Sequence, residues 1–461
     1  MSNVGSPSSP SRYHISTQPI RLTLYHPGYK VSAIMVTSYL PQVLTSHPTR
    51  SAHGTIRLAT LLLLAMLLVA PLHAQTFSVI HNFAGNGDGS VPYVGLTLDG
   101  AGNLYGATLY GGLANGCYGT GCGVIFKMSS RNSSWIFSPL YTFTGAGDGA
   151  FPDARVVFGP NGALYGSTVT GGNGDYQFGT GVVFSLQPPP HASGRFSDPW
   201  LETVLYSFGN VNDGNYPTGN LVFDAAGNIY GTTQNGGYEC EDTVYCGTVF
   251  ELARRGGGWN ESILHEFTDS NTAIPLSGVV FDAAGNLLGT TSEGLGAIFE
   301  LTNSGSGWTE TTVHYFQGQG DGYGPAGGLV PDASGNFYGA TASGGANGMG
   351  ALFKLQRVGG SWQVLPVYGL TATGPDWTLA RDAAGNFYGT TCEGGSHNSG
   401  SVFKLAPAGG SWVETLLYQF TGGTDGYCPL SGVTVDAAGN LYGTAWAGGS
   451  HGSGVVWEIT P

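Results

Sequence analysis

The sequence predicts an all-β fold, a seven-bladed β-propeller with four-stranded antiparallel blades, and three observations support this prediction. The phrase DxxGN(L/I/F)YG(T/A/S)T returns seven times with small changes, and its second glycine recurs every 50 to 65 residues. One four-stranded sheet with its loops has this length, which is too long for a coil of a β-helix. The 461 residues also include 79 glycines and 12% aromatic residues, whereas only 10% are charged, so we expect no helix after residue 75. The recurring glycines are Gly106, Gly166, Gly231, Gly289, Gly339, Gly389 and Gly443.

Each repeat carries the signals of three strands. In the last copy, residues 431–435 alternate between polar or small and apolar side chains, and residues 436–440 (DAAGN) form a tight connection. The Asp of this turn can accept hydrogen bonds from backbone amides, and its Gly can take the left-handed conformation. Residues 441–446 predict the second strand, and residues 455–459 predict the third strand after a Gly-rich loop.

The fourth, outer strand carries the pattern WxExxLYxF and predicts how the ring closes. One such strand, residues 76–83 (TFSVIHNF), precedes the first full repeat, whereas no fourth strand follows residues 455–459. If these two segments pair, they complete the seventh sheet and leave no unpaired edge between blades. We therefore expect residues 75–461 to form a single propeller domain.

The first 74 residues form a leader of a different kind. They contain five basic residues and no acid, and Arg57 precedes an apolar run at about residues 58–70 that ends near Ala74. A basic flank and a short apolar core predict a secretory signal, since the run is short for a membrane span. We expect an exported protein that is periplasmic, at the cell surface or secreted. Leu72 fits a cleavage site poorly, so a membrane contact through an uncleaved signal is the alternative, and residues 1–50 indicate a later start or a disordered leader.

The charge balance argues against nucleic acid as a partner. Beyond residue 74 the chain has 10 Lys or Arg and 29 Asp or Glu residues, a net charge of −19. A phosphate backbone would be repelled by such a protein. We expect a monomer that binds a protein or a carbohydrate ligand.

Two kinds of loop should share one face of the ring. The loop that enters each blade reads GxGDGxxP, and the loop between the second and third strands is a Gly-Gly stretch whose length varies from GGLANGCYGTGCG to SEGLG. The DxxGN turns on the opposite face barely vary between copies. Selectivity should therefore reside on the face with variable loops, because loops on a rigid scaffold tolerate change.

Aspartates of the entering loops are candidate ligand contacts. Calcium is one interpretation of a ring of carboxylates, but the DxDxDG spacing of a calcium loop is absent and Asp-Gly is an ordinary turn. We therefore expect no cofactor and no metal site, with calcium as the alternative, and we expect the aspartates of the DxxGN turns to cap those turns. The five loop residues are Asp88, Asp148, Asp213, Asp321 and Asp425.

Histidines occur in two settings. His397 and His451 occupy the matching loops GGSHNSG and GGSHGSG of adjacent blades and are candidate ligand contacts. His81, His265 and His314 instead occupy the outer-strand position that holds Tyr in other copies, so we expect them to pack and not to bind metal.

Aromatic residues near the variable loops could stack on sugars, and Tyr110 and Trp446 are the leading candidates. Others in the same setting are Tyr118, Tyr176, Tyr216, Tyr238 and Tyr323.

All six cysteines lie in the exported part and predict three disulfides in an oxidising compartment. Two pairs are close in sequence within one loop, and the third joins two loops that the architecture places on one face. The predicted pairs are Cys117–Cys122, Cys240–Cys246 and Cys392–Cys428. A metal site built from these cysteines lacks the CxxC spacing.

The elements DxxGNLYGTT, GG, GxVFKL, WxExxLYxF and FTGGxDGxxP recur in fixed order over the whole exported part. In this they resemble the bacterial choice-of-anchor tandem repeat GloVer-containing proteins. The resemblance implies an exported bacterial repeat protein, often with a C-terminal anchor, and no particular reaction. This chain shows no sorting signal or membrane helix after its last strand, so we do not expect C-terminal anchoring.

The sequence contains no GxSxG, HExxH or GxxxxGK motif, so we expect no catalytic residues and no enzyme. The favoured function is non-catalytic binding of a protein or a glycan by the variable loop face. One alternative is a polysaccharide-acting hydrolase or lyase, which would need two acids converging in the central mouth. The other is a purely structural cell-surface repeat protein.

Overall fold

In the computed structural model, the described residues are 22–26, 29–33 and 75–461, the last range with gaps at 114–115, 133, 174–178, 190–199, 210–212, 238–245, 270–271, 326, 372–373 and 376–377. The chain divides into two compact units, Met1–Leu72 and His73–Pro461. In the first unit, β1 (Leu22–His26) and β2 (Tyr29–Ala33) form an antiparallel hairpin. The predicted secretory signal at about residues 58–70 lies outside the described residues. Within the described ranges, no helix is long and apolar enough to cross a membrane.

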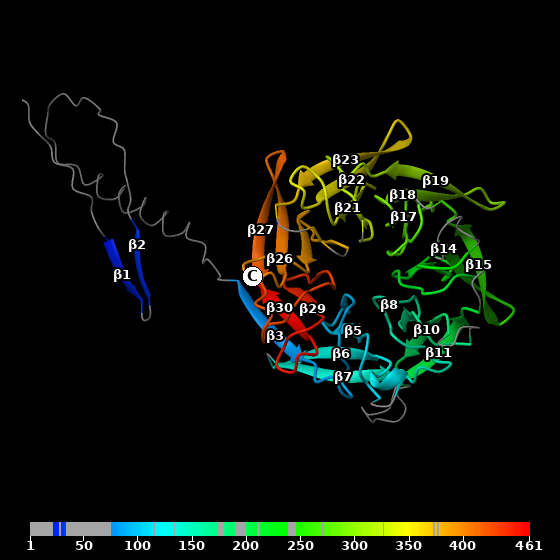
Figure 1. Cartoon of the computed structure of the whole chain (residues 1–461), viewed down its shortest axis with the longest axis horizontal. Coiled ribbons are helices and arrows are strands. Elements are labelled where there is room, and N and C mark those ends of the chain that lie inside the picture. Colours follow the sequence, from blue (N-terminus) through cyan, green and yellow to red (C-terminus); the bar gives the residue numbers. More distant parts are fainter. Residues whose placement is uncertain are drawn as a thin grey trace, which may run out of the picture. The chain divides into compact units, whose positions relative to one another are not determined.

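The second unit is the predicted propeller. Its described residues form 28 strands in seven four-stranded antiparallel sheets, arranged as the ring in Figure 1. A short 3₁₀ element, η1 (Cys117–Gly119), lies in a loop of the first blade.

The strands fall into four concentric sets. The innermost are β4 (Thr97–Leu98), β8 (Val157–Phe158), β12 (Val222–Phe223), β16 (Val280–Phe281), β20 (Val330–Pro331), β24 (Ala380–Arg381) and β28 (Thr434–Val435). The second strands are β5 (Leu104–Thr108), β9 (Leu164–Thr168), β13 (Ile229–Thr233), β17 (Leu287–Thr291), β21 (Phe337–Thr341), β25 (Phe387–Thr391) and β29 (Leu441–Ala445). The third strands are β6 (Val124–Arg131), β10 (Val182–Gln187), β14 (Thr248–Arg255), β18 (Ala297–Asn303), β22 (Ala351–Val358), β26 (Ser401–Ala408) and β30 (Val455–Thr460). The outer strands are β7 (Ser134–Thr142), β11 (Leu201–Ser207), β15 (Gly258–Glu266), β19 (Trp308–Tyr315), β23 (Ser361–Gly369), β27 (Ser411–Gln419) and β3 (Thr76–Asn82).

The ring closes as the sequence predicted. The seventh sheet has the order β28-β29-β30-β3, so its outer strand comes from the beginning of the second unit. β3 pairs antiparallel with β30, with Phe77 opposite Ile459 and Asn82 opposite Val455. Figure 1 shows the blue β3 beside the red β30. No blade therefore presents an open edge at this seam.

The innermost strands are shorter than the sequence indicated. Residues 431–435 were expected to be a strand, but only Thr434–Val435 pairs with β29. At Ser431 a side-chain hydrogen bond takes the place of a backbone hydrogen bond between the strands, because Ser431 Oγ accepts from Thr444 N at 2.9 Å. The backbone of residues 431–433 is thus free to bend around the centre of the ring.

The hydrophobic core lies between neighbouring blades. One cluster joins Val183 and Phe208 of the second blade to Leu221 and Phe250 of the third. Another joins Phe83 of the closing strand to the first blade. Because each blade buries its faces only against its neighbours, an isolated blade would leave most of its apolar surface in water.

The YG element of the repeat has a packing function. In the ladder each of these glycines faces an aromatic residue of the third strand, such as Phe299 opposite Gly289. A Cβ on Gly289 would lie 2.4 Å from Phe299 Cζ. In all seven blades an aromatic ring at the equivalent position of the third strand packs against the glycine, with Trp457 against Gly443 in the last. A side chain at this position would displace the buried ring.

The DxxGN turn is capped by its aspartate, as predicted. Asp436 Oδ1 accepts from Ala438 N at 2.9 Å and from Asn440 N at 2.8 Å. Its Oδ2 accepts from Asn440 Nδ2 at 2.8 Å and from Tyr442 OH at 3.2 Å. Gly439 has a φ of +87°, which explains why glycine recurs there. These aspartates belong to the scaffold.

Candidate functional site

The two variable kinds of loop meet on one face, as the sequence predicted. The loop that enters a blade pairs with the loop between the second and third strands of the same blade through an isolated antiparallel bridge. We call this side the loop face, and we call the opposite side, with the DxxGN turns and the outer hairpins, the turn face. The bridges join Ser90 to Tyr110, Ala150 to Thr170, Asn215 to Asn235, Tyr323 to Ser343 and Tyr427 to Ala447.

The predicted aspartates lie on the loop face, and each holds its own loop. Asp148 Oδ2 accepts from Thr144 N at 2.8 Å and from Tyr141 OH at 3.0 Å, and its Oδ1 accepts from Thr144 Oγ1 at 2.6 Å. The other four contact the equivalent outer-strand residue and entering-loop amide: Asp88 with His81 and Ala84, Asp213 with Tyr206 and Gly209, Asp321 with His314 and Gln317, and Asp425 with Tyr418 and Thr421. A ligand-binding role for these aspartates stays a prediction.

The sequence analysis did not predict that each aspartate contacts a Tyr or His of the outer strand, although the spacing between the two residues is constant. The Tyr or His precedes the Asp by seven residues, as in Tyr141 and Asp148. Burial and then the negative charge of Asp148 raise the pKa of Tyr141, so the phenol remains a hydrogen-bond donor. Among the described residues, no three His, Cys, Asp or Glu side chains gather closely enough to hold a metal ion.

The three histidines of the outer strands pack as predicted. Each ring lies edge-on to the Phe two positions later, at 4.7 Å for His81 and His265 and 5.1 Å for His314. His265 has Thr272 where the others have an Asp seven residues on. Burial lowers the pKa of His265 to about 4, so this ring is neutral in the folded protein.

The two loop histidines, His397 and His451, are exposed on separate loops. Each Nδ1 lies within hydrogen-bond distance of the preceding serine, at 2.9 Å for Ser396 Oγ and 3.0 Å for Ser450 Oγ. The structure does not bring either ring to an acid among the described residues. Their role as ligand contacts stays a prediction.

The candidate aromatic residues divide into exposed and packed ones. Trp446 is 37% exposed, whereas Tyr110 is half-buried and lies edge-on to Phe151 at 5.4 Å. Tyr176 and Tyr238 lie outside the described residues. The remaining exposed aromatic residues of the loop face are Tyr118 at 73%, Tyr216 at 38%, Tyr323 at 40% and Tyr427 at 37%.

Disulfides anchor the loop face. Cys117 is bonded to Cys122 within one loop of the first blade, and Cys392 is bonded to Cys428 between the two loops at the junction of the sixth and seventh blades. Cys246 is disulfide-bonded as well. Cys240, its predicted partner, lies outside the described residues.

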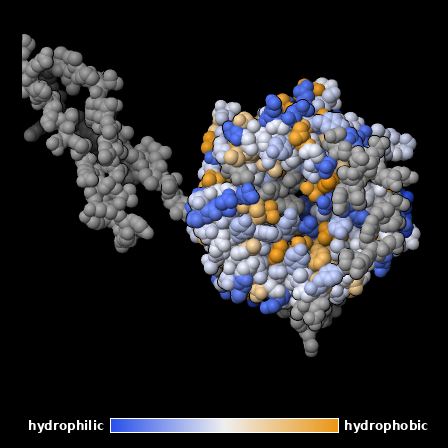
Figure 2. All heavy atoms as spheres, viewed as in Figure 1, coloured by the Kyte–Doolittle hydropathy of each residue, from blue (hydrophilic) through white to orange (hydrophobic). Residues whose placement is uncertain are grey.

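A central channel lies among the innermost segments of the second unit. It has a volume of about 780 Å³ and is lined by the innermost segments of all seven blades. Figure 2 shows the opening near the middle of the face in view, with apolar residues gathered around it. Its apolar wall includes Val94, Leu221, Val279, Leu329, Leu379 and Val433.

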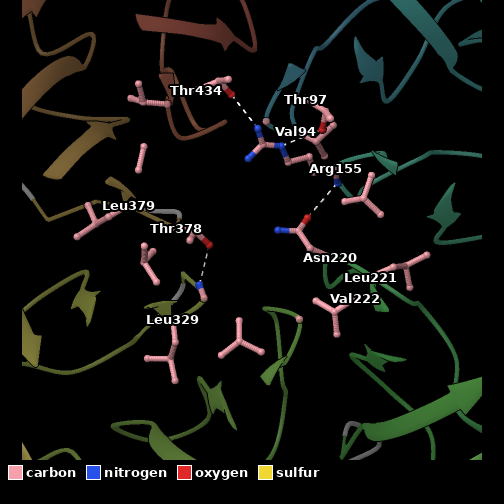
Figure 3. Close-up of a pocket in the computed structure, with 18 of the residues that line it drawn as sticks. Val94, Thr97, Arg155, Asn220, Leu221, Val222, Leu329, Thr378, Leu379 and Thr434 are labelled. Atoms are coloured by element: carbon pink, nitrogen blue, oxygen red, sulfur yellow. Dashed lines mark hydrogen bonds between the residues drawn. The ribbon is translucent and has the colours of Figure 1, made fainter. Parts of the chain in front are cut away.

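Polar side chains interrupt this wall, and Figure 3 shows Thr97, Arg155, Asn220 and Thr434 together on one side, with Thr378 across the channel. Arg155 lies against the first and seventh blades, where its Nε donates to Thr97 Oγ1 at 3.1 Å and its Nη2 to Thr434 Oγ1 at 2.9 Å and to the Leu96 carbonyl. Asn220 Oδ1 accepts from Arg155 N at 3.2 Å. The guanidinium is therefore fixed by the first and seventh blades, and the backbone of Arg155 is fixed by the third blade.

Asp153 lines the same channel two residues before Arg155. Both side chains are half-buried, because they touch the open channel while protein surrounds them on every other side. Burial raises the pKa of Asp153 to about 7 and lowers the pKa of Arg155 to about 10. Asp153 Oδ1 is buried and has no hydrogen-bond partner among the described residues.

These channel residues were not identified from the sequence, although a signal existed. Three residues after the recurring proline of the entering loop, four copies carry glycine, whereas Arg155, Asn220 and Thr378 break the pattern. The second blade alone carries a charged residue there. A departure from a repeated glycine at a channel-lining position is thus the feature that could have revealed them.

The fold and its two candidate surfaces define a seven-bladed propeller repeat protein. The family model described as Gloeobacter/Verrucomicrobia repeat matches residues 69–295 and residues 241–457, which together cover most of the chain. The chain belongs to this family, in agreement with its resemblance to the GloVer-containing proteins. No curated protein matches it.

Three solved structures illustrate the similarity to known proteins, all at low sequence identity. A fungal alcohol oxidase of the AA5 family in complex with copper has a TM-score of 0.54 at 14% identity, over 84% of this chain and 77% of that one. A candidate 6-phosphogluconolactonase from Bacteroides uniformis has a TM-score of 0.45 at 14% identity, over 70% and 84%. A protein of unknown function from Dyadobacter fermentans has a TM-score of 0.41 at 9% identity, over 84% and 99%. The likeness to the oxidase concerns the fold alone.

Proposed function

We propose that this protein is exported and binds a glycan or a protein through the loop face, without chemistry of its own. The distribution of exposed aromatic side chains is the observation that carries the proposal. Among the described residues, five of the six exposed Tyr and Trp side chains lie in loops of the loop face. The sixth, Tyr315, is the last residue of β19, where that strand reaches the same face. A surface that keeps aromatic rings in water on one side only is typical of a binding site.

The exposed rings favour a glycan over a protein as the ligand. Sugar rings offer apolar C–H faces that stack on Tyr and Trp, and the five aspartates of the entering loops are engaged in bonds to their own loops. The loops are also held in place by backbone bridges and disulfides. A prearranged surface loses little conformational entropy on binding, which improves affinity.

The channel supports binding over polysaccharide cleavage. A glycosidase-type mechanism needs two carboxyl groups about 5 to 10 Å apart. Among the described residues that line the channel, Asp153 is the one acid. A hydrolase or lyase therefore remains the alternative function, and it would need a second acid.

Glycan-array binding of the full chain tests the proposal. We expect Tyr323→Ala and Trp446→Ala each to weaken glycan binding by about 3- to 10-fold, the loss of one aromatic contact. Leu201→Ala is the matched control, because Leu201 is 64% exposed on the outer strand β11, away from the loops. Equal losses in all three variants, or no glycan bound by the wild type, would refute binding by loop-face aromatics.

Export is supported by the disulfides and by the predicted signal. Disulfides persist in oxidising compartments and are rare in the cytosol. Mass spectrometry of the protein recovered from its native host tests this part. We expect an N-terminus near residue 75, and a protein found only in the cytosol with reduced cysteines would contradict export.

A further inference from the structure

Arg155 presents a positive charge inside the channel, and no described residue forms an ion pair with it. Its hydrogen-bond partners are the neutral oxygens of Thr97, Thr434 and Leu96. The ion pairs of the described residues involve His81, His314 and Arg357, and none includes Arg155. A charge that is partly withdrawn from water is costly unless an opposite charge accompanies it. The charge of Arg155 therefore favours the binding of an anion in the channel.

Two hydrogen-bond donors next to this charge point into the open centre of the channel. In Figure 3 the free Nη1 of Arg155 and the Nδ2 of Asn220 both face the cavity, and the other polar atoms of these side chains are bonded to the wall. Neither atom is among the buried polar atoms that lack a hydrogen-bond partner. Both donors are therefore accessible from the channel. A guanidinium edge beside an amide N–H suits a carboxylate, which accepts two hydrogen bonds in one plane.

Asp153 adds an acceptor on the approach from the loop face. It lies two residues before Arg155, and both residues line the channel. Its Oδ1 is buried without a donor among the described residues, and such an atom normally finds one. A ligand hydroxyl would supply that donor.

We propose that the central channel binds a hydroxylated carboxylate of the sugar-acid class, with its carboxylate on Arg155 and Asn220 and a hydroxyl on Asp153. The ligand is either a free sugar acid or a uronate unit of a polysaccharide, since both present the same group. The cavity of about 780 Å³ exceeds the space that one sugar ring needs. This site is distinct from the aromatic surface of the loop face and does not depend on it.

Isothermal titration calorimetry of the full chain with glucuronate tests the site, with glucose as the neutral control and tetragalacturonate as the polymeric source. We expect binding of glucuronate or tetragalacturonate and at least tenfold weaker binding of glucose. The acid that binds with the higher affinity identifies the source of the ligand. Failure of both acids to bind, or equal binding of glucose, would overturn the proposal.

Two channel variants locate the binding residues. Asn220→Asp keeps the oxygen that accepts from Arg155 N but replaces the Nδ2 donor with an acceptor, so we expect the affinity for the acid to fall about 10- to 100-fold. We expect Arg155→Met to abolish binding, and its melting temperature reports any structural loss from the missing bonds to the wall. Because Asn220→Asp keeps those bonds, unchanged affinity in this variant would refute the site even if Arg155→Met fails to fold.

Arg381→Met is the matched control. Arg381 lines the same channel but lies over the ring of Phe387, with 6.0 Å between its Cζ and the ring centroid. We expect Arg381→Met to bind the acid as the wild type does. A loss of binding in Arg381→Met with normal binding in Asn220→Asp would show that Arg381, and not Arg155, binds the anion. That result would overturn the proposal. Loop-face variants such as Trp446→Ala should leave the affinity for glucuronate unchanged, so the two proposals fail separately.

Discussion

Gly289→Ala tests why glycine recurs after the tyrosine position of the repeat. An ideal Cβ on Gly289 would lie 2.4 Å from Cζ, 2.7 Å from Cε1 and 3.2 Å from Cε2 of Phe299. The Phe299 ring is 1% exposed and stands edge-on to Phe267 at 5.1 Å. It must therefore withdraw by about 1 Å into a packed core to restore ordinary carbon–carbon contact.

The expected cost of this overpacking is about 1 to 3 kcal/mol. For a unit of about 390 residues, an unfolding entropy of about 2.1 cal/mol/K per residue converts 1 kcal/mol to about 1.2 °C in Tm. We therefore expect Gly289→Ala to lower the Tm by about 1 to 4 °C in differential scanning calorimetry. In a Phe299→Leu background the same substitution should cost less, because the ring that it meets has gone.

Gly100→Ala is the internal control for this experiment. A Cβ on Gly100 meets nothing within 4 Å, and the equivalent turn position is alanine in five other copies. We expect Gly100→Ala to leave the Tm unchanged or to raise it slightly. An equal Tm for Gly289→Ala and Gly100→Ala would refute the packing explanation of the YG element.

Three further predictions address closure, disulfides and pH. Deletion of residues 76–83 removes the outer strand of the seventh blade, so we expect aggregation or a far lower Tm, and an unchanged Tm would contradict ring closure. Thiol titration of the denatured, unreduced protein should find no reactive thiol, whereas six would exclude the disulfides. His265→Tyr installs the residue that other copies carry at this position. Because burial lowers the pKa of His265 to about 4, the unfolded chain binds a proton near pH 6.5 that the folded protein does not, and stability is lost as the pH falls from about 6.5 to 4. The variant should therefore lose less Tm than the wild type between pH 7 and pH 4.5, and an equal loss would show that His265 is not responsible.

The architecture was predictable because the repeat encodes it redundantly. The Asp and Gly of each DxxGN turn, the apolar strands and the early outer strand all indicate the same four-stranded unit. Ring closure between β3 and β30 followed from the outer strand that precedes the first repeat and from the missing outer strand of the last repeat, and Cys392–Cys428 followed from the shared face of their loops. Seven copies of one pattern leave little freedom for another fold.

The channel site was not predictable to the same degree, because it depends on departures from the repeat. Arg155 and Asn220 each occur once, at a position where most copies carry glycine. They form a common site only because the seven innermost segments, which come from distant parts of the chain, converge on one axis. The short innermost strands were missed for a related reason, since the Ser431 side chain replaces backbone ladder bonds. Repetition predicts the scaffold, and its exceptions mark the sites that the three-dimensional structure brings together.

Pairing of β3 with β30 also constrains how the protein can be made. β3 is the first strand of the second unit to leave the ribosome, yet its partner, Val455–Thr460, is synthesised some 370 residues later. Blades one to six can assemble during translation as each neighbour appears. The β3 segment must wait unpaired until β30 emerges, so the first strand of the second unit is the last to find its partner.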